Sequence, residues 1–337
     1  MAKTLAFGVV SAGVQHMQSD DIDVDTKFQM VRDSGAFDYF DVTPPVDKIS
    51  EYAEASAKYN IPIIAGGFYY QLGQDEGLLN QHLENCHLLG TQVHNIQILA
   101  NNATMKRVTD AEIASLYIEA AKAGVNYDVV PCFEVHVNMW SENFGRVKKV
   151  ADLVEAQGVK FNMTLDPSHI IFKMDNPDEI RIQNMDRDVA NGDVILDPFH
   201  ADNICHKWMT AGYVRHAHAR SAVPHGPRNI WAKHPCGSPG RAIQYPFVQP
   251  GEGQWHSEWN EEKLEPWKEV FRQLFRHHSR TASSTLTTVS TEFIPYPDYG
   301  GGAKYSLFEQ NLACAEWLRK TWSQELLAAN ASGIDSI

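Results

Sequence analysis

Side chains that bind divalent metals occur in four short stretches of the second half of the chain: Phe133-Glu134-Val135-His136, Leu165-Asp166-Pro167-Ser168-His169, His216-Ala217-His218-Ala219-Arg220 and Ser290-Thr291-Glu292-Phe293. Each stretch places a carboxylate or an imidazole at the end of a run of β-branched or aromatic residues, where a parallel strand would pass into its loop. Carboxylates combined with imidazole suit Mn²⁺, Mg²⁺, Zn²⁺ or Co²⁺ better than a soft metal. The pattern therefore predicts a divalent-metal enzyme.

Alternation along a strand decides which of these side chains share a face. Glu134 and His136 point the same way, as do His216 and His218, so the spacing leaves either histidine of the second pair as the metal ligand. Arg220 falls beyond the end of that strand. One buried acid or imidazole alone is more often a satisfied core group, but four such coincidences at successive strand ends favour a common site.

Other side chains are candidates for contact with a substrate. In Asp166-Pro167-Ser168-His169 the aspartate ends a strand, and the loop would bring His169 over the same pocket. His16 follows the first predicted strand, at the expected rim of a pocket. Trp140 follows the fifth and could stack on a sugar ring, although core packing is the alternative for this residue.

Apolar, β-rich runs alternate with amphipathic segments, which is the pattern of repeated βα units around a parallel sheet. Eight such units would close a (β/α)8 TIM barrel. Strands are predicted at Leu5–Ser11, Phe37–Val42, Ile61–Ala65, Asn95–Leu99, Val129–His136, Lys160–Leu165, Tyr213–His218 and Thr285–Glu292. Helices are predicted at Val24–Ser34, Lys48–Tyr59, Glu76–Leu89, Asp110–Ala123, Ser141–Gln157, Asn260–His278 and Lys304–Thr321, with a shorter one at Pro198–Met209.

Two segments interrupt this rhythm. Residues 221–257 are rich in proline and glycine and follow the seventh predicted strand, so in a barrel they would form an extended loop over the C-terminal face, where active sites are built. Contact with a neighbouring subunit is the alternative. Residues 175–197 are polar and could serve the same rim.

Composition limits the class of protein. At 337 residues with 43% hydrophobic and 21% charged residues, the chain can form one elaborated domain spanning 1–337. A net charge of -13 without any Lys/Arg-rich run disfavours nucleic-acid binding. No long apolar span or cleavable leader appears, so we expect a cytoplasmic protein without a membrane segment. The five cysteines include no CxxC pair and are expected to be reduced.

The order of the motifs carries a family resemblance. Glu, Asp-x-x-His, His-x-Arg and a final Glu, with Pro250-Gly251-Glu252-Gly253 before the last helix and strand, resemble the xylose isomerase-like TIM-barrel superfamily of sugar isomerases and epimerases over nearly the whole chain. The resemblance implies one divalent metal, Mn²⁺ first among the candidates, held by Glu134, Asp166, His218 and Glu292. It also implies that His169 and Arg220 contact the substrate, with His216 as a further substrate contact or as the alternative ligand to His218.

Two features depart from the common pattern of that superfamily: Glu-Val-His replaces Glu-Pro after the fifth strand, and the insert after the seventh strand is long. In both respects, and in length, the chain is similar to the large subunit of bacterial C-glycoside deglycosidases. That likeness implies cleavage of the C–C glycosidic bond of 3-oxo-glucosides by elimination, together with a small β-rich partner subunit. An oligomer is expected under either resemblance.

The candidate chemistries share one step, the removal of a proton next to a sugar carbonyl that a metal has polarised. A ketose 3-epimerase or aldose-ketose isomerase would use Glu134 and Glu292 to move protons. A deglycosidase would use His136, because a neutral imidazole can take the proton at pH 7. A non-catalytic sugar-binding subunit is the third hypothesis, disfavoured because buried carboxylates are costly without a metal.

Overall fold

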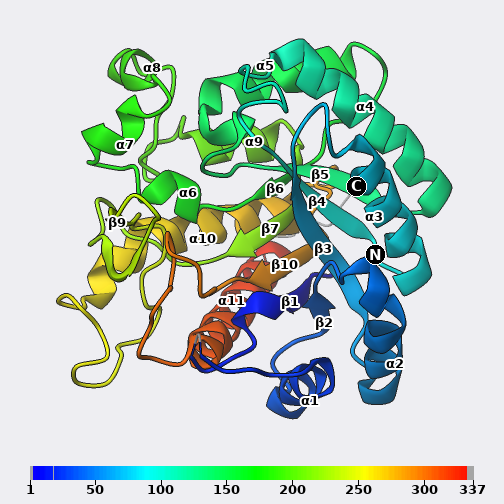
Figure 1. The fold of residues 1–337 in the computed structure, drawn as a ribbon. Helices are drawn as coiled ribbons and strands as arrows, with labels where there is room; N and C mark the ends of the chain where they lie inside the picture. The colour runs from blue at the N-terminus through cyan, green and yellow to red at the C-terminus, as the bar shows by residue number, and fades with distance from the viewer. Residues whose placement is uncertain (1–2, 18, 332–337) are drawn as a thin grey trace.

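Eight parallel strands close into a barrel that helices surround (Figure 1). The computed structural model describes residues 3–17 and 19–331. Around the barrel the strand order is β1, β10, β7, β6, β5, β4, β3, β2, so each strand pairs with its neighbour in the chain and β1 closes on β10. The strands are β1 Ala6–Val10, β2 Tyr39–Asp41, β3 Ile63–Tyr70, β4 Val93–Ile98, β5 Val130–Glu134, β6 Met163–Leu165, β7 Val214–Ala219 and β10 Thr288–Thr291. The predicted (β/α)8 barrel is confirmed.

All eight predicted strands are present, with shifted ends. The third runs five residues beyond Ala65, because Gly66 and Gly67 lack side chains where neighbouring backbone comes close: a Cβ on Gly66 would lie 2.6 Å from the Val42 carbonyl oxygen. The fifth ends at Glu134 rather than His136. His136 is therefore a loop residue, and its direction is set by the loop rather than by strand alternation.

The predicted helices are also present. α1 begins after Asp23, whose side chain accepts a hydrogen bond from Thr26 N, and ends at Gly35 in the left-handed conformation. The last helix extends ten residues beyond the predicted Thr321. The helices between strands are α1 Val24–Ser34, α2 Ile49–Tyr59, α3 Glu76–Leu89, α4 Asp110–Tyr127, α5 Phe144–Glu155, α9 Ile204–Thr210 and α10 Glu265–Arg280, and α11 Leu307–Ala331 follows β10.

The two irregular segments contain short elements of their own. Three short helices follow β6, namely α6 Ser168–Ile171, α7 Pro177–Arg181 and α8 Asp186–Ala190. Within 221–257, β8 Asn229–Lys233 and β9 Pro239–Gly240 form an antiparallel pair outside the barrel, beside α6 and α7 in Figure 1. The Asn229 amide donates to the carbonyl oxygens of Pro297, Tyr299 and Gly301, in the loop after β10.

Arg241 fixes the same segment to the loops after β5 and β6. Its guanidinium forms ion pairs with Glu142 and Glu179, and Glu142 also pairs with the buried Lys173 at 2.8 Å. Segment 221–257 is thereby attached to loops that follow β5, β6 and β10. Its role as a cover of the barrel mouth stays a prediction.

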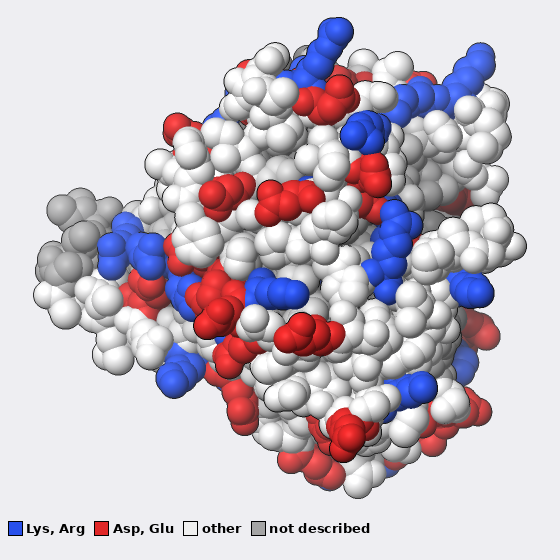
Figure 2. All heavy atoms as spheres, turned by 90° about the vertical axis from the view of Figure 1, so that its left-hand side faces the viewer, with Lys and Arg blue, Asp and Glu red and all other residues white. Residues whose placement is uncertain are grey.

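The surface and the thiols agree with the composition. On the face drawn in Figure 2, acidic and basic side chains are interspersed and the basic ones form no extended area. All five cysteines are free thiols, and only Cys236 is exposed. Within the described part of the chain, no helix has both the length and the apolarity needed to cross a membrane.

Candidate metal and substrate site

Four side chains from four neighbouring strands meet at the C-terminal end of the barrel. Glu134 ends β5, Asp166 directly follows β6, His218 belongs to β7, and Glu292 directly follows β10. All four are buried, and their possible ligand atoms all lie within 4.8 Å of one another. Their convergence follows from the strand order, because the carboxyl ends of adjacent parallel strands share one edge.

Glu134 is held by three hydrogen bonds. Oε2 accepts from the amides of Asn95 and Gln97 on β4, and Oε1 accepts from His218 Nδ1 at 3.0 Å. Burial alone would raise the pKa of Glu134, but His218 and His136 beside the carboxylate and the Asn95 hydrogen bond lower it to about 2. The carboxylate is therefore ionised and orientationally fixed.

His218 occupies the centre of the group. Its Nδ1 lies 3.0 Å from Glu134 Oε1 and 3.3 Å from Glu292 Oε2. Burial opposes a charge on this imidazole, but the Glu292 and Glu134 carboxylates outweigh it and raise the pKa of His218 well above its usual value. Nδ1 of His218 thus points toward the carboxylates of Glu134 and Glu292, as a nitrogen must if it is to bind the same metal ion as they do.

Arg220 packs into this group from beyond the end of β7. Its guanidinium is fully buried and donates to Asp166, to Glu292 Oε2 at 2.8 Å and to His169 Nε2 at 2.9 Å. The ring of Tyr299 covers it at 4.1 Å. Arg220 was predicted to contact substrate, and its contacts in the structure are with two of the proposed metal ligands and with His169.

The donor set fits a divalent cation. Three buried carboxylates lie together with Arg220 and His218 as their cationic neighbours. Burial, followed by repulsion from Glu292 and Glu134, raises the pKa of Asp166 to about 7 despite the adjacent Arg220. The group therefore holds more buried negative charge than its own cations balance, and a divalent ion with oxygen and imidazole ligands would supply the balance.

A second group, Asp41 with His216 and His218, shares the central imidazole. Asp41 ends β2, and its Oδ2 lies 3.4 Å from His216 Nε2 and 3.5 Å from His218 Nε2. Ser290 Oγ also donates to this oxygen. Since Asp41 faces Nε2 of His218 while the other carboxylates face Nδ1, we assign Asp41 to orienting that ring. His216 lies outside the first group, bonded through Nδ1 to Thr288 Oγ1 at 2.8 Å.

His136 and His169 lie ring to ring, with centroids 4.2 Å apart. His136 Nδ1 is 2.6 Å from the Val137 carbonyl oxygen, which can only accept, so Nδ1 carries the proton and Nε2 accepts from the Tyr299 hydroxyl at 3.0 Å. Burial lowers the pKa of His136, which keeps the ring neutral. His169 is buried, and its Nδ1 has no hydrogen-bond partner.

The remaining predicted residues lie farther out. His16 is exposed, with its Nδ1 2.8 Å from Ser306 Oγ and its ring against Phe308. Trp140 is buried against Phe133 in the packing around the barrel. The cavity beside the site is lined by neither of them, and their contact with substrate stays a prediction.

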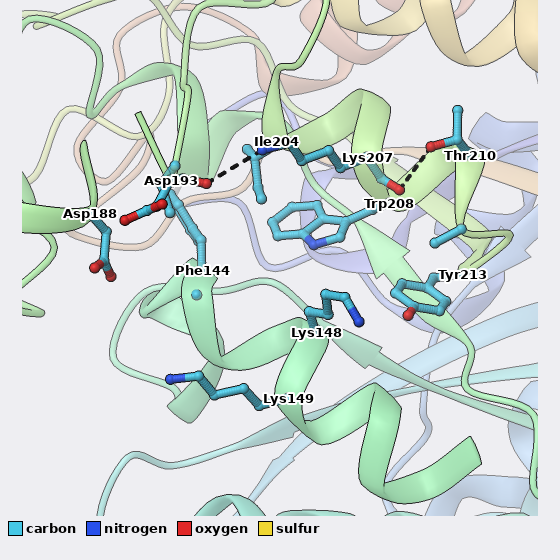
Figure 3. A pocket seen from close by; sticks show the side chains of 13 residues that line it. Phe144, Lys148, Lys149, Asp188, Asp193, Ile204, Lys207, Trp208, Thr210 and Tyr213 are labelled. Atoms are coloured by element: carbon cyan, nitrogen blue, oxygen red, sulfur yellow. Dashed lines mark hydrogen bonds between the residues drawn. The ribbon is translucent and has the colours of Figure 1, made fainter. Parts of the chain in front are cut away.

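That cavity has a volume of about 400 Å³ and reaches His218, Glu292, Asp41, Asn95 and Gln97. A larger one, about 660 Å³, lies outside the barrel between α5 and α9, where Figure 3 shows Trp208 with the lysines of both helices around it. No residue of the metal group lines the larger cavity. The smaller one is therefore the candidate substrate site.

Four of the residues that shape the site were not anticipated: Asp41, Asn95, Gln97 and Tyr299. Asp41 had a signal, since it is an aspartate close to the end of the run Phe37–Val42, much as Asp166 directly follows its strand. Asn95 and Gln97 alternate along β4 and share the face that points to Glu134. Tyr299 lies in a loop, and nothing local in the sequence fixes its direction.

Comparisons with known proteins support the fold. No protein-family model and no curated protein sequence matches the chain. Among solved structures, D-allulose 3-epimerase from Methylomonas sp. is similar over 96% of this chain and 99% of its own, with 12% identity and a TM-score of 0.54. The 3-keto-D-glucoside 4-epimerase from E. coli covers 94% of this chain and 100% of its own at 14% identity, TM-score 0.50. A probable 3-DHS dehydratase from Bacillus anthracis covers 94% and 99% at 8% identity, TM-score 0.53. At these identities the likeness shows a shared fold.

Proposed function

We propose that this chain is a metal-dependent enzyme that epimerises or isomerises a ketose by removing a proton from the carbon next to the carbonyl. The observation that carries the proposal is the convergence of Glu134, Asp166, His218 and Glu292 within 4.8 Å at the mouth of the barrel. A divalent ion held by these side chains would polarise the sugar carbonyl and acidify the adjacent C–H. Structural neighbours named as sugar epimerases add support through the fold.

Glu292 is the better placed of the two carboxylates to remove the proton. Arg220 and His218 both contact its Oε2, which leaves Oε1 available, and the residue lines the cavity. Glu134 has both oxygens in hydrogen bonds and a pKa of about 2, so it is the weaker base. Glu134 enters from β5 and Glu292 from β10, two strands that β6 and β7 separate in the barrel. A proton taken by one carboxylate and returned from the other side yields an epimer, and its return to the next carbon yields an isomer.

Two neighbouring residues, His169 and Arg220, would serve the sugar and the carboxylates respectively. The buried Nδ1 of His169 lacks a partner and can donate to a sugar hydroxyl. Arg220 pairs with the Asp166 and Glu292 carboxylates and supplies positive charge beside them.

Elimination from a 3-oxo-glycoside is the second candidate, and the contact between His136 and Tyr299 is the observation that favours it. His136 is neutral, with Nε2 as its basic nitrogen and the Tyr299 hydroxyl 3.0 Å away. In a C-glycoside deglycosidase, His136 would take the proton next to the carbonyl, and the bond to the substituent one carbon further would then break. A structural neighbour named as a 3-keto-D-glucoside 4-epimerase supports this candidate through the fold alone. The small β-rich partner subunit belongs to this candidate.

The deciding experiment is proton NMR in D₂O with Mn²⁺-loaded protein and three substrates: D-allulose, D-fructose and a 3-keto-glucoside. We expect deuterium at the carbon next to the carbonyl of a ketose and formation of its epimer or isomer. Glu292→Gln should abolish the exchange, whereas Glu119→Gln, an exposed acid on α4, should leave it unchanged. Release of an aglycone without exchange into free ketose would select elimination, and no exchange with any carbonyl sugar, neutral or anionic, would refute the proposal.

A further inference from the structure

The cavity beside the metal group contains one positively charged lining residue. Of its lining side chains only Lys27, on α1, is a lysine or arginine, whereas Asp41 and Glu292 contribute carboxylates. α1 packs beside β1 and β2, so Lys27 enters from that side of the barrel (Figure 1). The mechanism proposed above makes no use of this residue.

Lys27 is half-buried without an acidic partner. Its Nζ donates to the Ser11 carbonyl oxygen at 3.1 Å, and burial lowers its pKa. Among residues 3–17 and 19–331, no ion pair to Lys27 is formed, although the same helix supplies Asp25 to Lys58 at 2.6 Å. An ammonium group has three N–H donors, so at least one remains for a ligand.

Thr43 is a second residue that lines this cavity and carries an unpaired hydroxyl. It follows β2, and its buried Oγ1 has no hydrogen-bond partner. A buried hydroxyl without a partner costs free energy unless a ligand or water bonds to it. Lys27 and Thr43 thus line one cavity with unused hydrogen-bonding capacity.

A purely structural role explains these observations poorly. Bracing the Ser11 carbonyl needs one neutral donor, whereas a lysine brings the desolvation cost of a charge that no carboxylate offsets. The chain has a net charge of -13, and carboxylates line the cavity, so an anion would be repelled unless a fixed cation compensates.

We propose that Lys27, assisted by Thr43, binds an anionic group of the substrate, which makes the natural substrate a sugar acid or a sugar phosphate rather than a neutral sugar. The inference rests on the proposed function only in placing the sugar in this cavity. Carboxylate and phosphate offer the same oxygen acceptors to an ammonium and a hydroxyl, so the choice between them belongs to the experiment.

The test measures binding by isothermal titration calorimetry with Mn²⁺-loaded protein at constant ionic strength. The probes are D-glucuronate, D-glucose 6-phosphate and D-glucose. We expect one anionic probe to bind about 10-fold or more tightly than D-glucose, in line with the strength of hydrogen bonds to charged groups. Preference for glucuronate or for the phosphate would identify the anion.

Three variants test whether Lys27 causes the preference for the anionic probe. Lys27→Met should weaken binding of the anionic probe by about 10–100-fold and change the affinity for D-glucose little. Lys27→Arg should retain most of the preference for the anionic probe. Lys149→Met removes one exposed positive charge on α5 and should bind like the parent. If Lys27→Met fails to fold by circular dichroism, Thr43→Val should show a smaller loss of the same kind.

Equal affinity of the parent for neutral and anionic probes would overturn the inference, as would an equal loss for both in Lys27→Met. The readout is independent of turnover. If anion binding depends on Lys27 but the protein exchanges no substrate proton, this inference stands and the proposed function is refuted. If the protein exchanges substrate protons but binds anionic and neutral probes equally, the proposed function stands and this inference is refuted.

Discussion

At the scale of single residues, the two nitrogens of His218 divide the site into two environments. Nδ1 faces Glu134 and Glu292, and Nε2 faces Asp41. A carboxylate on the far side of a ligand imidazole fixes the ring and its tautomer, which raises the affinity for metal. Asp41 should therefore influence metal binding without being one of the four ligands.

Replacing Asp41 tests this assignment. We expect Asp41→Asn to lower Mn²⁺ affinity about 10–100-fold, because the amide keeps the shape but loses the charge that orients His218. Titration calorimetry with the metal-free protein measures the change, and Asp166→Asn, which alters a proposed ligand, should lose more. Unchanged affinity in Asp41→Asn would show that Asp41 plays no part in the metal site.

His136 separates the two candidate chemistries. If it is the base of an elimination, His136→Gln should bind metal normally and lose about 10²–10⁴-fold in turnover of a 3-keto-glucoside. Tyr299→Phe, which removes the hydroxyl bonded to Nε2, should shift the pH profile of that turnover. A near-normal rate of ketose epimerisation in His136→Gln would assign the proton transfer to Glu292 and Glu134 instead.

At the scale of elements, the long segment after β7 is held by charges on one arginine. Arg241 pairs with Glu142 after β5 and Glu179 in α7, and Lys173 completes the cluster. Burial would raise the pKa of Glu142, but Lys173 and Arg241 more than offset it and lower the pKa to about 2. Such a carboxylate contributes stability that depends on pH.

The lowered pKa of Glu142 determines how its contribution to the free energy of unfolding changes with pH. Because the folded pKa of Glu142 lies below the unfolded one, the contribution is complete above about pH 5 and is lost as the pH falls toward 2. Its size is on the order of 3 kcal/mol. Glu142→Gln should therefore be less stable at pH 7 by roughly that amount, and the difference should shrink on acidification. Urea unfolding at several pH values, with Glu119→Gln as the exposed control, measures it. A difference independent of pH would contradict the assignment.

At the scale of the whole molecule, an ion held by the four proposed ligands would join four neighbouring strands, β5, β6, β7 and β10. A ligand that binds only the folded state at 100 times its Kd adds about 2.7 kcal/mol to stability. We expect Mn²⁺ to raise the melting temperature by about 2–4 °C and EDTA to reverse the change. Asp166→Asn should show little or no rise. Equal shifts in parent and variant would indicate that the ion binds elsewhere.

Much of this architecture could be predicted from sequence, because buried parallel strands are continuous apolar runs and their ends carry the chemistry. Glu134, Asp166 and Glu292 were predicted in this way, whereas the spacing left His216 and His218 open and the family resemblance favoured His218. Asn95, Gln97 and Tyr299 were not, since amides and phenols are ordinary in strands and loops and only their neighbours in space give them a role. The position of Arg220 also needed the structure, because a long side chain can fold back onto its own strand end.

Because β1 pairs with β10, the barrel and the site at its mouth can form only after the last strand has been synthesised. β1 leaves the ribosome about 280 residues before β10 is made, and β2 about 250 residues before it, so β1 waits on the order of 15–60 s at usual rates of synthesis. During that time Asp41 has no Ser290 and Glu134 has no Glu292, and the unpaired edge of β1 is open to other chains. If the four proposed ligands hold an ion, binding requires the last strand to be in place, and a growing chain stalled before Thr288 would lack Glu292 and leave the edge of β1 unpaired.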